Sequence, residues 1–191
     1  MWRVATSQTW ELRRLKTPPL SKLRIVLFPD PILKKKAVEV SQFGEPVRAL
    51  AERMLELMRE DKGVGLAAPQ VGVGLRIFVC NATGEPADDL ICINPQLVEL
   101  SGAEEREEGC LSIPGATVTM RRAVRAVMQA IDVEGKLFQL AQSDLPARIW
   151  QHEIDHLNGR LIIDNMSTAD EIANRRVLKQ LKEKFQASRK R

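Results

Sequence analysis

The stretch LPARIWQHEIDHLNG, residues 145–159, decides the expected fold of this chain. We expect a helix over residues 146–158, because Ser143 or Asp144 can cap its start and Asn158-Gly159 is a typical helix end. Its apolar residues fall on more than one face: Ala147, Ile149, Trp150, Ile154 and Leu157. A helix that is apolar on several sides is usually buried, so its charged residues need partners or a purpose.

The same stretch contains both histidines of the chain, His152 and His156, in the pattern HExxH. A spacing of four residues places both imidazoles on one helical face, where they can bind a single transition-metal ion. Glu153 lies beside them, within reach of a water on that metal. The alternative is a polar stripe on a buried helix, but two buried imidazoles and a carboxylate would need partners if no metal were bound.

A catalytic metal site of this kind needs a third protein ligand and an open fourth position. No other histidine exists, so the candidates are cysteine, aspartate and glutamate. We favour Cys110 over a carboxylate, because EEGCLSIPG changes from polar to apolar at this residue and the backbone there is expected to be irregular. Cys80 and Cys92 lie in apolar strand-like runs and are expected to act as small hydrophobic residues.

Apolar spacing predicts the elements around this helix. An amphipathic helix is expected over residues 46–61, a glycine-rich loop over 63–74 and a last helix over 169–185. Strands are expected at residues 23–28, 75–80, 90–94, 124–132 and 136–141. Short turns between the strands favour hairpins. We therefore predict an α+β fold with mostly antiparallel sheets around the buried helix, an N-terminal amphipathic helix and a C-terminal helix.

Composition and charge are typical of one globular domain. The 191 residues are 44% hydrophobic and 28% charged, which permits a sizeable core and excludes a disordered chain. Three cysteines without regular spacing argue against a disulfide framework and for a reducing compartment. Residues 63–80 are too interrupted to cross a membrane, and residues 1–24 lack the apolar core of a signal peptide. The strongly basic end, residues 175–191, suits either solvation or a nucleic-acid surface.

Three segments resemble the signature motifs of peptide deformylases, in the order and at separations similar to those of the family. They are GVGLAAPQVG at residues 63–72, EEGCLS at 107–112 and QHEIDHLNG at 151–159, and LRIVLFPDPIL at 23–33 resembles the usual opening of the family. The resemblance covers about residues 23–165. It implies the peptide deformylase fold and a metal site of Cys110, His152 and His156, with water as the fourth ligand.

The activity that the resemblance implies is hydrolysis of the formyl group from the N-terminal formyl-methionine of new polypeptides, with release of formate. It assigns Gln70 and the backbone N–H of Leu111 to the formyl oxygen, and we expect Glu153 to activate the water. The alternative enzyme is an HExxH metallopeptidase, whose site a carboxylate would complete. A structural metal module or a basic RNA-binding protein is the non-enzymatic alternative.

The resemblance also implies how the peptide is held. Val64, Gly65 and Gly109 are similar to positions whose backbone pairs with an extended substrate. Val64 and Ile149 are expected to line the methionine pocket, although plain core packing is as good an account of Ile149.

Other positions concern the surroundings of the site. Glu108 and Asp155 are expected to orient ligands or neighbouring backbone. By the resemblance, Thr117 stands where many deformylases carry a substrate-binding arginine. Either Arg121, Arg122 or Arg125 replaces it, or the affinity for the peptide is lower.

The expected cofactor is one divalent metal ion per chain, ferrous iron by resemblance, with zinc, nickel or cobalt as alternatives. The expected partners are formyl-Met nascent peptides and the ribosome, the latter through the basic residues Lys179, Lys182, Lys184, Arg189, Lys190 and Arg191. We expect no membrane contact and a bacterial cytoplasmic location, with an organelle as the lesser alternative. The expected division is a basic extension at residues 1–22, a catalytic domain at 23–170 and a C-terminal basic helix and tail at 171–191.

Overall fold

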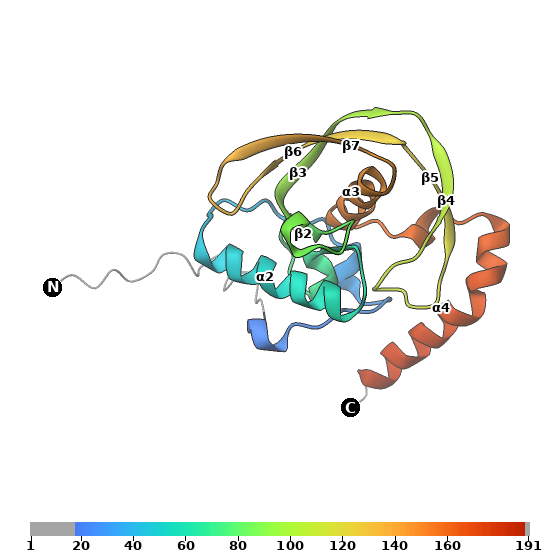
Figure 1. Cartoon of the computed structure of the whole chain (residues 1–191). Helices are drawn as coiled ribbons and strands as arrows, with labels where there is room; N and C mark the ends of the chain where they lie inside the picture. Colours follow the sequence, from blue (N-terminus) through green and yellow to red (C-terminus); the bar gives the residue numbers. More distant parts are fainter. Residues whose placement is uncertain (1–17, 190–191) are drawn as a thin grey trace.

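The computed structural model describes residues 18–189 and shows a helix enclosed by curved antiparallel sheets (Figure 1). The three α-helices are α2 (Glu45–Glu60), α3 (Asp144–Leu157) and α4 (Thr168–Ser188). Short 3-10 turns occur at Leu20–Lys22, Pro31–Lys34, Ala68–Val71, Pro86–Asp88 and Ile162–Asn165. Most of the expected extension at residues 1–22 therefore lies outside the described residues, as do Lys190 and Arg191 of the basic tail.

The strands form two separate sheets. The larger sheet has the order β1-β2-β3-β6-β7, with every neighbouring pair antiparallel. Its strands are β1 (Gly65–Ala67), β2 (Ile77–Cys80), β3 (Leu90–Ser101), β6 (Arg125–Ile131) and β7 (Leu137–Ser143). The smaller sheet is a ribbon of β4 (Glu104–Glu108) and β5 (Val118–Arg122). The predicted α+β class with mostly antiparallel sheets is confirmed.

Helix α3 lies in the interior, beneath the arch of β3, β6 and β7 (Figure 1). It begins at Asp144, two residues before the expected start, with Ser143 at the N-cap position, and it ends at Leu157 before Asn158. Gly159 follows with a φ of 73°, and a Cβ there would lie 2.6 Å from the carbonyl oxygen of Lys34. Glycine is required at that turn, and it closes the helix where the sequence predicted.

The core forms on both faces of β2. Ile77 and Val79 point to the cluster beneath α2, whereas Phe78 and Cys80 point to the cluster around α3. Successive residues of a strand face opposite sides, and here both faces of the strand are covered by a core cluster. All four side chains are therefore buried. β2 therefore fixes α2 and α3 relative to one another.

Two predictions about the segments near the site were wrong. Residues 23–28 belong to no strand, because their amides pair with irregular backbone: Val26 N donates to Gln70 O at 2.7 Å and Phe28 N to Ser112 O at 2.8 Å. Residues 63–74 are not simply a loop, since they contain β1 and a 3-10 turn at Ala68–Val71. Residues 23–28 thus lie against residues 63–74, to which the Val26–Gln70 bond joins them.

The ribbon of β4 and β5 was not predicted. The β4 sequence, EEREE, has no apolar alternation, and most of its residues are exposed. Only its last residue, Glu108, is buried, opposite Val118 of β5. The ribbon therefore places one buried carboxylate, Glu108, in the interior. The chain that follows, residues 109–117, is partly buried, with Ser112, Ile113 and Ala116 as its buried residues.

Helix α4 begins at a capping box, in which Ser167 and Asp170 bond each other's backbone amides. It is longer than the expected 169–185. Leu181 and Asn174 are its buried residues, while Val177 and Leu178 pack against the cluster that contains Ile113. None of the helices within residues 18–189 is long and apolar enough to cross a membrane.

Candidate metal centre

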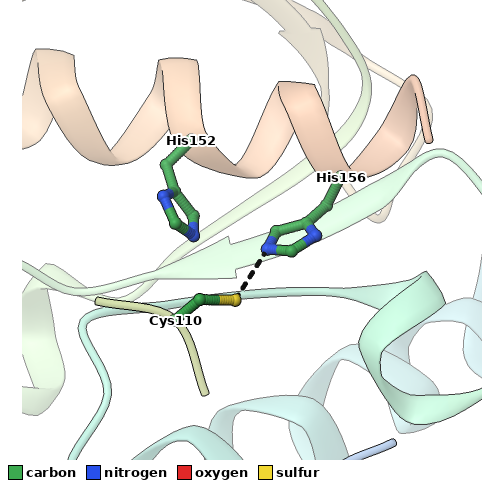
Figure 2. A group of neighbouring side chains, drawn as sticks. All are labelled: Cys110, His152 and His156. Carbon is green, nitrogen blue, oxygen red and sulfur yellow. Dashed lines mark hydrogen bonds between the residues drawn. The ribbon is translucent and has the colours of Figure 1, made fainter. Parts of the chain in front are cut away.

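The side chains of Cys110, His152 and His156 converge, as Figure 2 shows. His152 and His156 project from successive turns of α3, with ring centroids 5.0 Å apart. Cys110 faces them from the irregular chain after β4, and its Sγ lies 3.3 Å from His156 Nε2. One ligand atom of each residue lies within 4.8 Å of the others. The structure thus brings together the three residues that the sequence favoured as ligands.

This donor set fits a divalent transition metal. A thiolate and two imidazole nitrogens within 4.8 Å of one another can bind one small ion and leave a coordination position open. Within residues 18–189, no other group of three or more His, Cys, Asp or Glu side chains meets this criterion. Cys80 and Cys92 are buried elsewhere and have no part in it.

A buried carboxylate fixes the orientation of one imidazole. Glu108 Oε2 lies 3.0 Å from His152 Nδ1, which leaves the other ring nitrogen for a metal. Both Glu108 oxygens also accept hydrogen bonds of 2.9 Å from Arg122, and Asp155 binds the same guanidinium at 2.5 Å. Burial alone would raise the pKa of Glu108, but the hydrogen bonds from His152 and Arg122 lower it to about 2. The expected orienting roles of Glu108 and Asp155 agree with these contacts.

Arg148 belongs to the same network and was missed in the sequence. It precedes His152 by one helical turn and donates to Glu108 Oε1 at 2.8 Å. It also donates to the carbonyl oxygens of Met120 and Glu104, both at 3.1 Å. The sequence did contain a signal for Arg148: it is a charged residue on a helix that was predicted to be buried.

Glu153 faces the pocket from α3 and is 3% exposed. Its Oε2 is buried and has no hydrogen-bond partner within the described chain. Burial raises the pKa of this carboxyl to about 7. Gly65 of β1 lies so close that a Cβ there would be 2.3 Å from Glu153 Oε1. A carboxylate with this pKa can both accept and release a proton near neutral pH.

Two hydrogen-bond donors lie beside Cys110. The Gln70 side chain is 1% exposed, and its Oε1 accepts a 2.8 Å bond from the backbone N of Ala67. This bond turns the amide nitrogen toward Cys110 Sγ and Ser112 Oγ, at 3.5 and 3.3 Å. The Leu111 N–H makes no hydrogen bond to any part of the chain that the structure describes. The amide nitrogen and this free N–H can together stabilise a developing oxyanion.

A pocket of about 420 Å³ opens onto these groups. All four residues expected to contact a peptide line it, namely Val64, Gly65, Gly109 and Ile149. Gln70, Cys110, Leu111, His152 and Glu153 line it as well. Apolar walls with a few convergent polar groups are typical of a ligand site.

The residues considered for the missing arginine lie apart from this lining. Thr117 is exposed, and neither it nor the three candidate arginines, Arg121, Arg122 and Arg125, is among the lining residues. Arg122 is committed to Glu108 and Asp155, and Arg125 pairs with Glu99. Arg148 is the arginine that does line the pocket.

Comparison with known proteins gives one consistent result. A family model described as "Polypeptide deformylase" matches residues 22–171. The peptide deformylase of Dictyoglomus thermophilum is 48% identical over 135 residues, which cover 71% of this chain and 86% of that protein. The chloroplastic/mitochondrial peptide deformylase 1B of Arabidopsis thaliana is 37% identical over 167 residues, 86% of this chain and 61% of that protein. A crystal structure of a peptide deformylase from Legionella pneumophila superimposes with a TM-score of 0.80 at 41% identity, covering 86% and 98% of the two chains.

Proposed function

The chain belongs to the peptide deformylase family, and on this basis we propose how its own residues carry out the reaction of that family. It is a metal-dependent hydrolase that removes the formyl group from the N-terminal formyl-methionine of new polypeptides and releases formate. The alternative of an HExxH peptidase loses its support, since the family match is to deformylases and a cysteine, not a carboxylate, faces the two histidines.

Cys110, His152 and His156 would hold the metal, and we propose ferrous iron as the native ion. Zinc, nickel and cobalt suit the same donors, so the donor set supports a transition metal without selecting one. A divalent ion supplies Lewis acidity there, since it lowers the pKa of water and polarises a carbonyl oxygen. Glu108 keeps His152 in the orientation and tautomer that leave its outer nitrogen free to bind.

Glu153 moves the proton. Its buried carboxylate accepts a proton from the attacking water, so that the oxygen can add to the formyl carbon. It then returns the proton to the methionine nitrogen as the carbon–nitrogen bond breaks, which yields formate and a free amine. The unpartnered Oε2 and the pKa of about 7 support this role, because the group can gain and lose a proton within one turnover.

Gln70 and Leu111 stabilise the formyl oxygen. The Gln70 amide nitrogen and the Leu111 backbone N–H both lie beside Cys110 and can donate to an oxygen that gains negative charge. Because the Gln70 side chain is held by Ala67 and buried, no reorganisation is needed when the charge develops.

The peptide is held along β1. This strand lies at the edge of its sheet, where the backbone of Gly65 can pair with an extended chain that has Gly109 on its other side. Val64 precedes the strand, and its carbonyl oxygen already accepts a 2.9 Å bond from Asn81 N, so its N–H is the group left for the peptide. Ile149, which lies in the pocket wall, receives the methionine side chain together with Val64.

The observation that carries this proposal is the convergence of Cys110, His152 and His156 next to the buried, unpartnered Glu153. The test is formate release from formyl-Met-Ala-Ser without oxygen, by protein loaded with ferrous iron, nickel, cobalt or zinc. We expect formate release that depends on the bound metal. For the iron form we also expect a loss of activity in air. Cleavage of internal peptide bonds without formate would instead favour a peptidase.

We also propose that the enzyme is cytoplasmic. Residues 23–170 carry catalysis, and residues 171–191 dock on the ribosome. The exposed cations of α4 support the docking, together with Arg189, which follows the helix: Arg175, Arg176, Lys179, Lys182 and Lys184. Phosphates of ribosomal RNA would attract this surface, so binding should weaken as salt rises. Deletion of residues 186–191 should reduce co-sedimentation with ribosomes, and unchanged co-sedimentation over a range of salt would refute the docking role.

A further inference from the structure

The side chain of Asn174 pairs with the backbone of a residue far away in the sequence. Asn174 lies on α4 and is 3% exposed. Its Oδ1 accepts a bond of 3.1 Å from Thr117 N, and its Nδ2 donates to Thr117 O at 2.7 Å. The amide thereby satisfies both backbone groups of Thr117, as a neighbouring strand would. The same Nδ2 also donates to Asp170 O at 2.9 Å, which fixes the amide on its own helix.

The chain that Asn174 holds is the wall of the pocket. From Cys110 it runs through two successive turns, since Ile113 N donates to Cys110 O at 2.9 Å and Ala116 N donates to Ile113 O at 3.1 Å. Ile113, Gly115 and Ala116 all line the pocket. This segment has Cys110 at one end. At the other end are the two hydrogen bonds between Asn174 and the backbone of Thr117, which we call the Asn174 clasp.

Apolar contacts alone do not define the position of this segment. Ile113 and Ala116 pack in the same buried cluster as Leu181, but such packing is not directional. Thr117 itself is exposed, so burial does not hold it. The paired hydrogen bonds of Asn174 do set a direction, because hydrogen bonds weaken steeply away from linear geometry.

We propose that Asn174 is a positioning residue for the bound peptide, and this rests on the proposed function. It holds residues 113–117 in the conformation that forms one wall of the pocket. In this chain Thr117 has no guanidinium, although the resemblance places an arginine at this position. Residues 113–117 contribute to peptide binding because their backbone is held in the right position. Asn174 touches neither the reacting atoms nor the residues that would hold the metal.

The test compares Asn174→Ala and Asn174→Asp with the parent, as full-length, iron-loaded protein without oxygen. We expect the KM for formyl-Met-Ala-Ser to rise about tenfold in the alanine variant, as suits the loss of two hydrogen bonds, while kcat stays within about twofold. The aspartate variant keeps the acceptor for Thr117 N but turns a carboxylate oxygen toward Thr117 O, so its KM should rise at least as much. Bound metal should be unchanged in both.

The control variant is Leu181→Ala, which removes a buried side chain of α4 but no bond to Thr117. It should lower the melting temperature and leave KM unchanged. An equal rise of KM in Leu181→Ala would reduce Asn174 to a structural role, and an unchanged KM in both Asn174 variants would overturn the proposal. Loss of metal with a fall in kcat would also overturn it, because the clasp would then support Cys110.

A second measurement does not depend on activity. Hydrogen exchange of the backbone amides in residues 113–119 should be faster in Asn174→Asp than in the parent, and exchange in α3 should be the same. Equal exchange in residues 113–119 would contradict the clasp. Absence of formate from the parent itself would refute the proposed function, whereas an active parent with unaltered variants would refute this inference alone.

Discussion

Glu108 holds the guanidinium of Arg122 through both carboxylate oxygens, at 2.9 Å each, and both side chains are buried. The folded pKa of Glu108, about 2, lies below its ordinary value of 4.5. The stabilisation from its charge is therefore complete above about pH 4.5 and is lost as the pH falls toward 2.

Glu108→Gln should lower the free energy of unfolding by about 3–5 kcal/mol at neutral pH, because it leaves Arg122 without its main partner. The difference from the parent should shrink as the pH falls from about 4.5 toward 2. Urea titrations at several pH values measure it. Glu107→Gln, at the exposed neighbouring position, is the matched control and should show little change. A difference that stays constant with pH would contradict the assigned pKa.

Glu153→Ala should reduce formate release by about 10²–10⁴-fold, because it removes the one buried carboxylate of the described pocket lining that has an unpartnered oxygen. Glu108, the other buried carboxylate there, is bound to Arg122, Arg148 and His152. Bound metal should be the same as in the parent, since Glu153 is not among the three candidate ligands. Metal analysis and a formate assay on the same sample test both statements. Turnover at the parent rate would remove Glu153 from the mechanism.

Gln70→Glu should lower kcat by about 10²–10³-fold, the usual cost of removing one oxyanion donor. The variant keeps an oxygen for the Ala67 amide but has no N–H to donate toward Cys110. Steady-state kinetics with formyl-Met-Ala-Ser measures the loss. If only KM changed, Gln70 would contact the ground state and not the developing charge.

Gly65→Ala should lower activity by about 10²-fold, because the new methyl group would lie 2.3 Å from Glu153 Oε1 and displace that carboxylate. Gly74→Ala is the matched control, since a Cβ at Gly74 meets nothing within 4 Å. Kinetics and melting temperatures of the two variants form the test. Equal activities would mean that Glu153 tolerates displacement.

The metal-free native protein should contain one thiol that reacts with a disulfide reagent, and the unfolded protein three. Cys110 is partly exposed, whereas Cys80 and Cys92 are buried. Burial raises the pKa of Cys80 to about 12 and that of Cys92 well above its usual value. Because the thiolate is the reactive form, both should stay inert until the chain unfolds. In Cys110→Ser the native protein should show no fast thiol.

Sequence patterns predicted the elements that depend on residues close together in the chain. Helix α3 and its end at Gly159 follow from capping and periodicity, and α2 follows from its apolar spacing. The ribbon was missed because the residues of β4 are stabilised by pairing with β5 and not by an apolar face. Residues 23–28 have the composition of a strand, but their partners are irregular backbone.

The site divides in the same way. Cys110, His152, His156 and Glu153 were identified from residue type, spacing and motif. Arg148 and the Asn174 clasp depend on contacts between segments that are 28 to 57 residues apart, and no spacing rule encodes such contacts. Tertiary hydrogen bonds of this kind become visible only when the elements are placed in space.

The free edge of β1 has a consequence for inhibition. A compound that pairs with this edge at Gly65 would contact main-chain amides and carbonyls, which every amino acid except proline possesses. No substitution except one to proline deletes these atoms, and a side chain added at Gly65 would displace Glu153. Resistance to such a compound would therefore have to arise elsewhere in the pocket or outside the enzyme.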